Sequence, residues 1–179
     1  MIILMGLAGS GKSTQGQMLA GETGRIWLSA GQVLRDTQDP EVQEIQEKGD
    51  LVPNELTERL MTEGMLKAVR EGKDVVIDGF PREESQAEWI AENLASVMKL
   101  ALIIDVPKEE LTRRLLLRGR EDDTEEAIEE RFRIVEQNLY SVCEILEKAG
   151  VPIRRVDGVG TPEEVFVRVK EAVSEVEGE

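Results

Sequence analysis

Eight residues near the start of the chain have the types and the spacing needed to hold phosphate groups. The segment Gly6-Leu-Ala-Gly-Ser-Gly11-Lys12-Ser13 matches the pattern G-x-x-x-x-G-K-S/T, and it lies between an apolar run at 2–5 and a predicted helix at 12–20. Glycines let backbone N–H groups converge on phosphate oxygens, and the amino-terminal end of a helix adds positive potential. In such a loop Lys12 reaches the β and γ phosphates of a nucleoside triphosphate, and the Ser13 hydroxyl ligates Mg²⁺.

The predicted triphosphate contacts lie on this loop and at the start of the helix that follows it: Gly6, Ala8, Gly9, Ser10, Gly11, Lys12, Ser13 and Thr14. The chain has no N-K-x-D motif for reading guanine, so we expect ATP rather than GTP. The loop alone does not identify the reaction, because switches, motors and small-molecule kinases all use it.

A second group of charged residues follows the apolar run at 75–77. Asp78 stands where a strand would end, and ligands bind at the carboxyl ends of the strands in open parallel sheets. We therefore expect Asp78 to face Mg²⁺ or one of its waters, although Asp78-Gly79 is also typical of an ordinary turn. Arg82 follows in the same loop, where it can hold a second anion.

A similar layout occurs at Leu28-Ser-Ala-Gly31-Gln-Val-Leu-Arg35, where Gly31 allows close approach of the backbone and Arg35 lies one helical turn further on. Four more arginines lie later in the chain among acidic residues: Arg114, Arg118, Arg120 and Arg131. They indicate either a further anion site or a solvated charged face.

The elements that must position these residues alternate along the chain. Apolar runs predict strands at 2–5, 26–28, 75–77, 100–106 and 152–156. Helical patterns lie between them, at 12–20, 31–35, 55–69, 84–94, 108–117, 124–148 and 162–176. Alternation of this kind predicts an α/β fold in which helices cover both faces of a five-stranded parallel sheet. Apolar spacings of four and three within 124–148 indicate a core-facing stripe or, alternatively, a coiled-coil seam.

The composition limits the partners of such a site. The 179 residues include 22 Lys and Arg against 37 Asp and Glu, and the resulting net charge of −15 would repel nucleic acids and anionic membranes. Without histidine, and with a single cysteine, the chain has no histidine base, zinc cluster or internal disulfide. No segment reaches the roughly 18 unbroken apolar residues of a membrane span. We expect a cytoplasmic, monomeric protein of one domain that binds neither nucleic acid nor membranes.

Together these segments resemble the adenylate kinase and nucleoside monophosphate kinase family, in its short-lid form. The likeness covers nearly the whole chain, and its motifs are the phosphate loop, Ser29-Ala-Gly31 with Arg35, Gly49-Asp-Leu-Val-Pro53, Asp78-Gly-Phe-Pro-Arg82 with Gln86, and Gly119-Arg-Glu-Asp-Asp123 with Arg131. The resemblance implies a P-loop three-layer sandwich at 1–179 with a monophosphate-binding lobe at 29–58 and a short lid at 118–131. It also implies the reversible, Mg²⁺-dependent reaction of ATP with AMP to give two ADP.

The resemblance also implies roles for individual residues. Arg114 would stack on the adenine of ATP, and Arg118 would join the ATP contacts. The implied AMP contacts are Ala30, Gly31, Arg35, Leu51, Val52, Gly79, Arg82, Gln86, Arg120 and Arg131. The implied catalytic residues are Lys12, Arg82, Arg118, Arg120 and Arg131.

Departures from the family pattern leave alternatives for the substrate. The lid is much shorter than usual, and Gln32 replaces the usual acidic residue. Ala30 stands where adenylate kinases carry Thr or Ser, which favours a UMP/CMP kinase, whereas Gln86 favours AMP. A non-enzymatic nucleotide-binding regulator would need no acceptor-side arginines such as Arg35 and Arg82. A kinase with a hydroxyl acceptor would need a catalytic carboxylate and fewer arginines.

The chemistry of the predicted reaction agrees with the residue types. The attacking oxygen belongs to a monophosphate that is already anionic at pH 7, so the reaction needs no general base. ATP and a monophosphate together bring about six negative charges. Positioning and charge neutralisation by lysine, arginine and Mg²⁺ would then carry the catalysis.

Overall fold

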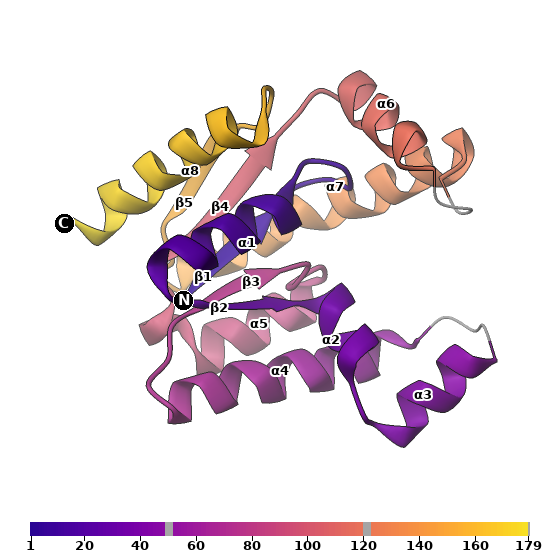
Figure 1. The fold of residues 1–179 in the computed structure, drawn as a ribbon. Coiled ribbons are helices and arrows are strands. Elements are labelled where there is room, and N and C mark those ends of the chain that lie inside the picture. The colour runs from indigo at the N-terminus through magenta and orange to yellow at the C-terminus, as the bar shows by residue number, and fades with distance from the viewer. Residues whose placement is uncertain (49–51, 120–122, 179) are drawn as a thin grey trace.

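The computed structural model describes residues 1–48, 52–119 and 123–178. Within these residues a sheet of five parallel strands lies between two layers of helices (Figure 1). The strands are β1 (Ile2–Met5), β2 (Ile26–Ser29), β3 (Val75–Asp78), β4 (Leu100–Asp105) and β5 (Ile153–Asp157), in the order β2-β3-β1-β4-β5. The predicted α/β three-layer architecture is confirmed, and each predicted strand agrees to within one residue at either end.

The central strand β1 explains why its sequence lacks polar alternation. It pairs in parallel with β3, where Ile2 lies opposite Val76, and with β4, where Ile2 lies opposite Leu100. All four residues of β1 are buried. A strand covered by helices on both faces needs apolar side chains at every position, which the run at 2–5 provides.

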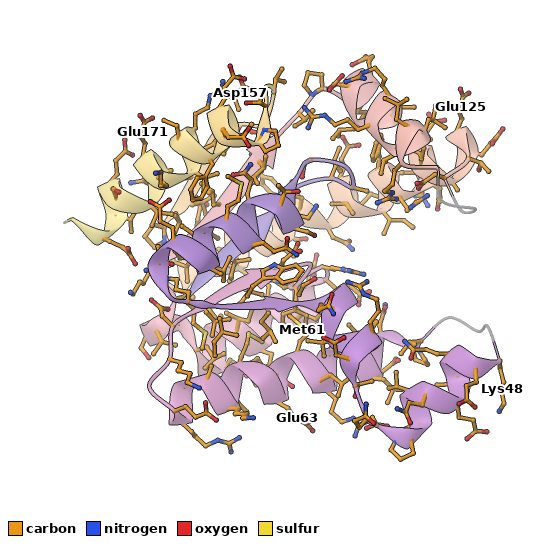
Figure 2. All side chains as sticks on the ribbon, viewed as in Figure 1. Lys48, Met61, Glu63, Glu125, Asp157 and Glu171 are labelled. Carbon is orange, nitrogen blue, oxygen red and sulfur yellow. The ribbon has the colours of Figure 1, made fainter. Side chains whose placement is uncertain are left out.

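Two helices cover one face of the sheet and three cover the other (Figure 1). The first pair is α1 (Lys12–Thr23) and α8 (Pro162–Glu177), and the second set is α4 (Asn54–Arg70), α5 (Glu84–Asn93) and α7 (Glu125–Lys148). Helix α4 has one face toward the sheet and one toward solvent. Met61 points toward the sheet and is fully buried, while Glu63 points to solvent (Figure 2).

The apolar stripe of α7 faces the protein interior along the whole helix. Ile128 and Phe132 are buried near its start, where they pack with Leu111 and Leu115 of α6 (Lys108–Arg118). Near its end, Val142 and Leu146 join the core beneath the sheet. The core-facing interpretation of this stripe is confirmed.

One helix was not predicted from the sequence. Besides α2 (Ala30–Asp36), the segment before the gap at 49–51 contains α3 (Pro40–Glu47), whose residues are mostly polar. The side chain of Asp39 accepts hydrogen bonds from the N–H groups of Glu41 and Val42, and Pro40 occupies the first turn. Val42 is its buried residue. A short 3-10 turn, η1 (Ala95–Val97), completes the described elements.

Two peripheral parts of the structure project on the same side of the sheet, beyond the carboxyl ends of the strands (Figure 1). One consists of α2 and α3, and the other of α6 with the start of α7. The first contains residues of the predicted lobe at 29–58, and the second contains Arg118 and the residues from 123 onward of the predicted lid at 118–131. Residues 49–51 and 120–122 lie outside the described residues. In the described part of the chain no helix is both long enough and apolar enough to cross a membrane.

Candidate active site

The phosphate loop connects β1 to α1 and depends on glycine geometry. Gly6, Gly9 and Gly11 have φ angles of 135°, 83° and 94°, a region that side chains disfavour. At Gly6 a Cβ atom would also lie 2.6 Å from the carbonyl oxygen of Ile104 on β4. The loop can therefore pass close to the neighbouring strand only with glycine at this position.

Lys12 is folded against the loop. Its Nζ donates hydrogen bonds to the carbonyl oxygens of Gly6 and Leu7, both at 2.8 Å. Burial lowers the pKa of Lys12 to about 8, Asp78 opposes this shift, and Arg82 adds to it. The ammonium group is still mostly protonated at pH 7, so it provides a partly buried positive charge beside the loop.

Ser13 and Asp78 meet because β1 and β3 are neighbours in the sheet. The Ser13 hydroxyl donates a 2.6 Å hydrogen bond to Oδ2 of Asp78. Asp78 is only 3% exposed. A hydroxyl and a carboxylate side by side are oxygen ligands of the kind that Mg²⁺ prefers. Among the described residues no group of three or more acidic residues or cysteines could hold a metal by itself. The pair therefore fits a Mg²⁺ ion that takes its other ligands from water and nucleotide phosphates.

A cavity of about 360 Å³, called here the central cavity, lies against the phosphate loop. The loop after β3, α5 and α7 provide its other walls. It brings together seven of the residues singled out from the sequence: Gly6, Ala8, Lys12, Gly79, Arg82, Gln86 and Arg131. The triphosphate motif and four of the predicted acceptor-side residues, namely Gly79, Arg82, Gln86 and Arg131, thus share one space.

Arg82 and Gln86 are locked to each other within this cavity. The backbone N–H of Arg82 donates to Oε1 of Gln86 at 2.8 Å, and Nε of Arg82 donates to the carbonyl oxygen of Gly79 at 2.8 Å. The first bond orients the Gln86 amide, because its oxygen must face the backbone N–H. A Cβ atom at Gly79 would lie 3.5 Å from the methyl group of Ala30, so Ala30 adjoins the same loop.

Arg118 and Arg131 share a buried carboxylate that the sequence reasoning left without a role. Arg118 donates from Nε and Nη2 to the two oxygens of Asp123, at 2.9 and 2.7 Å, and Arg131 donates from Nη2 to Oδ1 at 3.1 Å. The Asp123 side chain has no exposed surface. The two guanidinium groups are therefore held next to each other, while Arg120 lies outside the described residues.

A second cavity of about 340 Å³, called here the outer cavity, lies on the other side of the phosphate loop. Its walls include five of the predicted ATP contacts, namely Gly9, Ser10, Gly11, Thr14 and Arg114. The sequence reasoning missed its other lining residues, which come from α1, α6, the turn after β5 and the start of α8: Gln15, Glu110, Arg113, Gly158, Gly160, Pro162 and Val165.

Other predicted AMP contacts lie apart from both cavities. Arg35 donates to the side-chain oxygen of Gln32 at 2.7 Å on the exposed surface of α2, beside Gly31. Val52 lines neither cavity in the described structure, and Leu51 lies outside the described residues. Asn138, which lines the central cavity, was missed, although it lies two helical turns after Arg131 on the same face of α7.

A family model described as Adenylate kinase matches residues 4–151. The chain belongs to the adenylate kinase family. It is 37% identical to an adenylate kinase of Thermus thermophilus, with 96% of each chain covered. Adenylate kinase of Micrococcus luteus is 34% identical over 98% of this chain and 91% of its own. Human adenylate kinase isoenzyme 1 is 34% identical over 94% and 91%.

Membership of the adenylate kinase family identifies the chain as an enzyme, a nucleoside monophosphate kinase. The family match includes the phosphate loop, the loop after β3 and α7 up to its end, so it spans the walls of the central cavity. These findings favour the adenylate kinase interpretation over a UMP/CMP kinase and over a nucleotide-binding regulator.

Proposed function

We propose that the enzyme transfers the γ-phosphoryl group of ATP to AMP in the central cavity, giving two ADP in a reversible reaction. The observation that carries this proposal is the shared cavity, in which Lys12 of the triphosphate loop lies with Arg82, Gln86 and Arg131. A nucleotide-binding regulator has no need for cations on the acceptor side of its triphosphate.

Catalysis in this arrangement rests on charge and position. The α-phosphate of AMP is anionic at pH 7, so no side chain has to remove a proton before its oxygen attacks. Lys12, Arg82 and Arg131 neutralise the phosphates and hold attacking and leaving oxygens in line. Asp123 keeps Arg131 and Arg118 together, so that both can contact the transferred group.

Mg²⁺ would be held by Ser13 directly and by Asp78 through water. The ion supplies charge neutralisation on the β and γ phosphates when it is bound. The hydrogen bond from Ser13 to Asp78 aligns the hydroxyl beside the loop before nucleotide binds.

The remaining ATP contacts belong to the loop and to the outer cavity. The residues are Gly6, Ala8, Gly9, Ser10, Gly11 and Thr14 around the phosphates, and Arg114 against the adenine. Arg118 and Arg120 complete the lid side. On the AMP side we assign Ala30, Gly31, Arg35, Leu51, Val52 and Gly79, of which Gly79 adjoins both Arg82 and Ala30.

Gln86 reads the acceptor base through its amide nitrogen. Because its oxygen faces the N–H of Arg82, Nε2 is the donor left for a ligand. Adenine N1 and cytosine N3 are acceptors and can receive this bond, whereas guanine N1 and uracil N3 are donors and cannot. Selection of AMP over CMP then depends on stacking and pocket depth, which provide about 1 to 3 kcal/mol.

We also propose that the enzyme acts as a monomer in the cytoplasm. Both cavities are built within one chain, so the reaction needs no residue from a second copy. Cys143, the only cysteine, is half-buried on α7, which fits a reducing compartment.

A coupled assay of nucleoside diphosphate formation with AMP, UMP, CMP, GMP and dTMP tests the proposal. We expect AMP to have the highest kcat/KM, CMP to be measurably used, and GMP to be poor. A higher kcat/KM for UMP or CMP than for AMP would support a pyrimidine nucleotide kinase instead. Binding of ATP without turnover of any acceptor would support a regulator.

A further inference from the structure

Arg114 is held at both ends of its guanidinium group. Its Nε donates to Oε1 of Glu110 at 2.7 Å, one turn earlier in α6. Its Nη2 donates to the carbonyl oxygen of Gly158 at 3.2 Å, in the turn between β5 and α8. The guanidinium group is thereby fixed along the wall of the outer cavity, across from the phosphate loop that lines the same space.

The Gly158 anchor is rigid. A Cβ atom at Gly158 would lie 2.5 Å from Cγ2 of Ile104 and 2.6 Å from Cγ2 of Val106, so the turn is seated directly on β4. Its N–H also donates to the carbonyl oxygen of Asp105 at 2.7 Å. The freedom of Arg114 is therefore decided at its other anchor, Glu110.

Glu110 serves two arginines at once. Arg113 donates to both of its oxygens at 2.8 Å, in addition to the bond from Arg114. Hydrogen bonds from Arg113 and then from Arg114 lower the pKa of Glu110 to about 2, so the carboxylate is ionised at any ordinary assay pH. Both arginines line the outer cavity, but Arg113 is 61% exposed and Arg114 is 24% exposed, so Arg114 is the more enclosed of the two.

The charge of Glu110 has the wrong sign for a triphosphate site. A carboxylate beside this cavity repels the phosphates of a nucleotide, and this repulsion falls with distance and with salt. Orientation of Arg114 has the opposite effect, because a guanidinium plane held in place stacks on a base without first losing rotational freedom. The two roles of Glu110 thus predict opposite changes in ATP binding when it is removed.

We propose that Glu110 is a positioning residue for the base of ATP, acting through Arg114. The inference rests on the proposed function, because it takes the outer cavity as the site of the adenine of ATP. It assigns to α6 of this chain a determinant of donor affinity that acts by orienting another side chain.

The test compares donor and acceptor kinetics of Glu110→Ala with those of the wild-type enzyme. We expect the KM for ATP to rise about two- to fivefold, the range that a partly exposed ion pair supports, with kcat and the KM for AMP unchanged. Inorganic tripolyphosphate, used as an inhibitor that competes with ATP, has phosphates but no base. Its inhibition constant should stay the same or fall. Glu110→Gln keeps an acceptor for Arg114 and should show a smaller rise.

Two control variants separate this role from general effects. Glu144→Gln breaks a pair of the same i,i+4 spacing, with Lys148 at 2.6 Å, far along α7, and should leave all constants unchanged. Arg133→Gln breaks an exposed arginine–glutamate pair with Glu130 on α7, outside both cavities, and should leave the KM for ATP near wild type. An unchanged or lower KM for ATP in folded Glu110→Ala, or an equal rise for tripolyphosphate, would overturn the inference. Failure of the wild type to phosphorylate AMP would instead refute the proposed function.

Discussion

Lys12 is partly buried, and the proposed reaction uses its charge. Its Nζ donates to two loop carbonyl groups, and burial lowers its pKa to about 8 from the ordinary 10.5. The folded protein therefore holds a charge that would be better solvated in the unfolded chain. Phosphate groups of a bound nucleotide supply the compensating charge, so ligand binding and stability are coupled at this residue.

We expect Lys12→Met to lower kcat at least about 10²-fold, because a preorganised charge beside the transferred phosphoryl group is lost. The fold should persist, since the methionine side chain is similar in length and the ammonium group is not part of the core. The coupled assay measures the loss, and circular dichroism confirms folding. Near-wild-type activity in the folded variant would refute the assignment of the loop.

Lys12→Met should also change how the free energy of unfolding depends on pH. The folded pKa of about 8 lies below the unfolded value of 10.5, so the unfolded chain binds more protons between these pH values. The free energy of unfolding of the wild type therefore gains a contribution as pH rises from 8 to 10.5. Lys12→Met should lack this contribution. Urea unfolding of both proteins at pH 7 and pH 10 measures it, and identical pH dependences would show that Lys12 is solvated.

Arg82, the cation that we assign to the acceptor side, lines the central cavity together with Lys12. We expect Arg82→Ala to raise the KM for AMP with little change in the KM for ATP, because a charge-assisted hydrogen bond of about 1.5 to 3 kcal/mol is lost. Arg70→Ala, at an exposed site at the end of α4, is the matched control. Equal losses of ATP and AMP affinity in a binding titration would contradict the assignment of Arg82 to AMP.

At the scale of elements, α1 shows how packing overrides helix propensity. Its two glycines, Gly16 and Gly21, both lie within the helix. A Cβ atom at Gly16 would lie 2.9 Å from the indole ring of Trp27, whereas one at Gly21 would meet no atom within 4 Å. The close contact lets α1 lie directly against β2, which helps to set the loop before it.

These two glycines make a matched pair of variants. Gly21→Ala should stabilise the protein by about 0.5 to 1 kcal/mol, because alanine is the better helix former. Gly16→Ala gains the same propensity but overpacks the Trp27 contact, which costs about 1 to 3 kcal/mol, so the net change should be destabilising. Urea unfolding curves give both values. Stabilisation by both substitutions would mean that α1 and β2 separate easily.

The elements were easier to predict from the sequence than the contacts among them. Strands buried on both faces and helices with an apolar stripe leave a strong pattern, so nearly every element was found. The exception among the α-helices, α3, has only Val42 and Ile45 as apolar residues, and its start depends on the cap at Asp39. Strand order left no local pattern, because β1 pairs only with strands that come much later in the chain.

In the site, too, residue types could be predicted from the sequence but their contacts could not. The phosphate loop is recognisable because its function requires residue types at fixed spacing, and the structure brings it together with Arg82, Gln86 and Arg131. By contrast, the Asp123 carboxylate that holds two arginines and the orientation of the Gln86 amide arise from tertiary contacts. A sequence pattern indicates such residues without indicating their partners.

At the scale of the whole molecule, an ion-pair network joins the amino-terminal ends of the strands to α8. Asp74, just before β3, accepts hydrogen bonds from Arg25 at 3.1 Å and Lys99 at 2.7 Å, and it also pairs with the amino group of Met1 at 2.8 Å. Glu177 of α8 pairs with the same Arg25 and Lys99. The network ties together segments that are distant in the sequence.

Asp74→Asn tests this network. Burial alone would raise the pKa of Asp74, but Lys99, the Met1 amino group and Arg25 hold it far below 3.8. A lowered folded pKa contributes stability above the unfolded value, and this contribution is lost as pH falls through the folded pKa. We expect the variant to lose about 1 to 2 kcal/mol at pH 7, since water screens part of the interaction. The difference should shrink below about pH 4, and a constant difference measured by urea unfolding would contradict the ionic origin.

The central place of β1 in the sheet has a consequence for synthesis on the ribosome. Ile2 pairs with Val76 and Leu100, so β1 leaves the ribosome about 70 residues before its first partner strand, a delay of about 4 to 15 seconds at ordinary translation rates. During this time an apolar strand that is fully buried in the finished enzyme has no sheet to join. The nascent chain must therefore keep this segment out of intermolecular contacts until β3 and β4 emerge, which makes the interval before β3 appears the period of greatest aggregation risk.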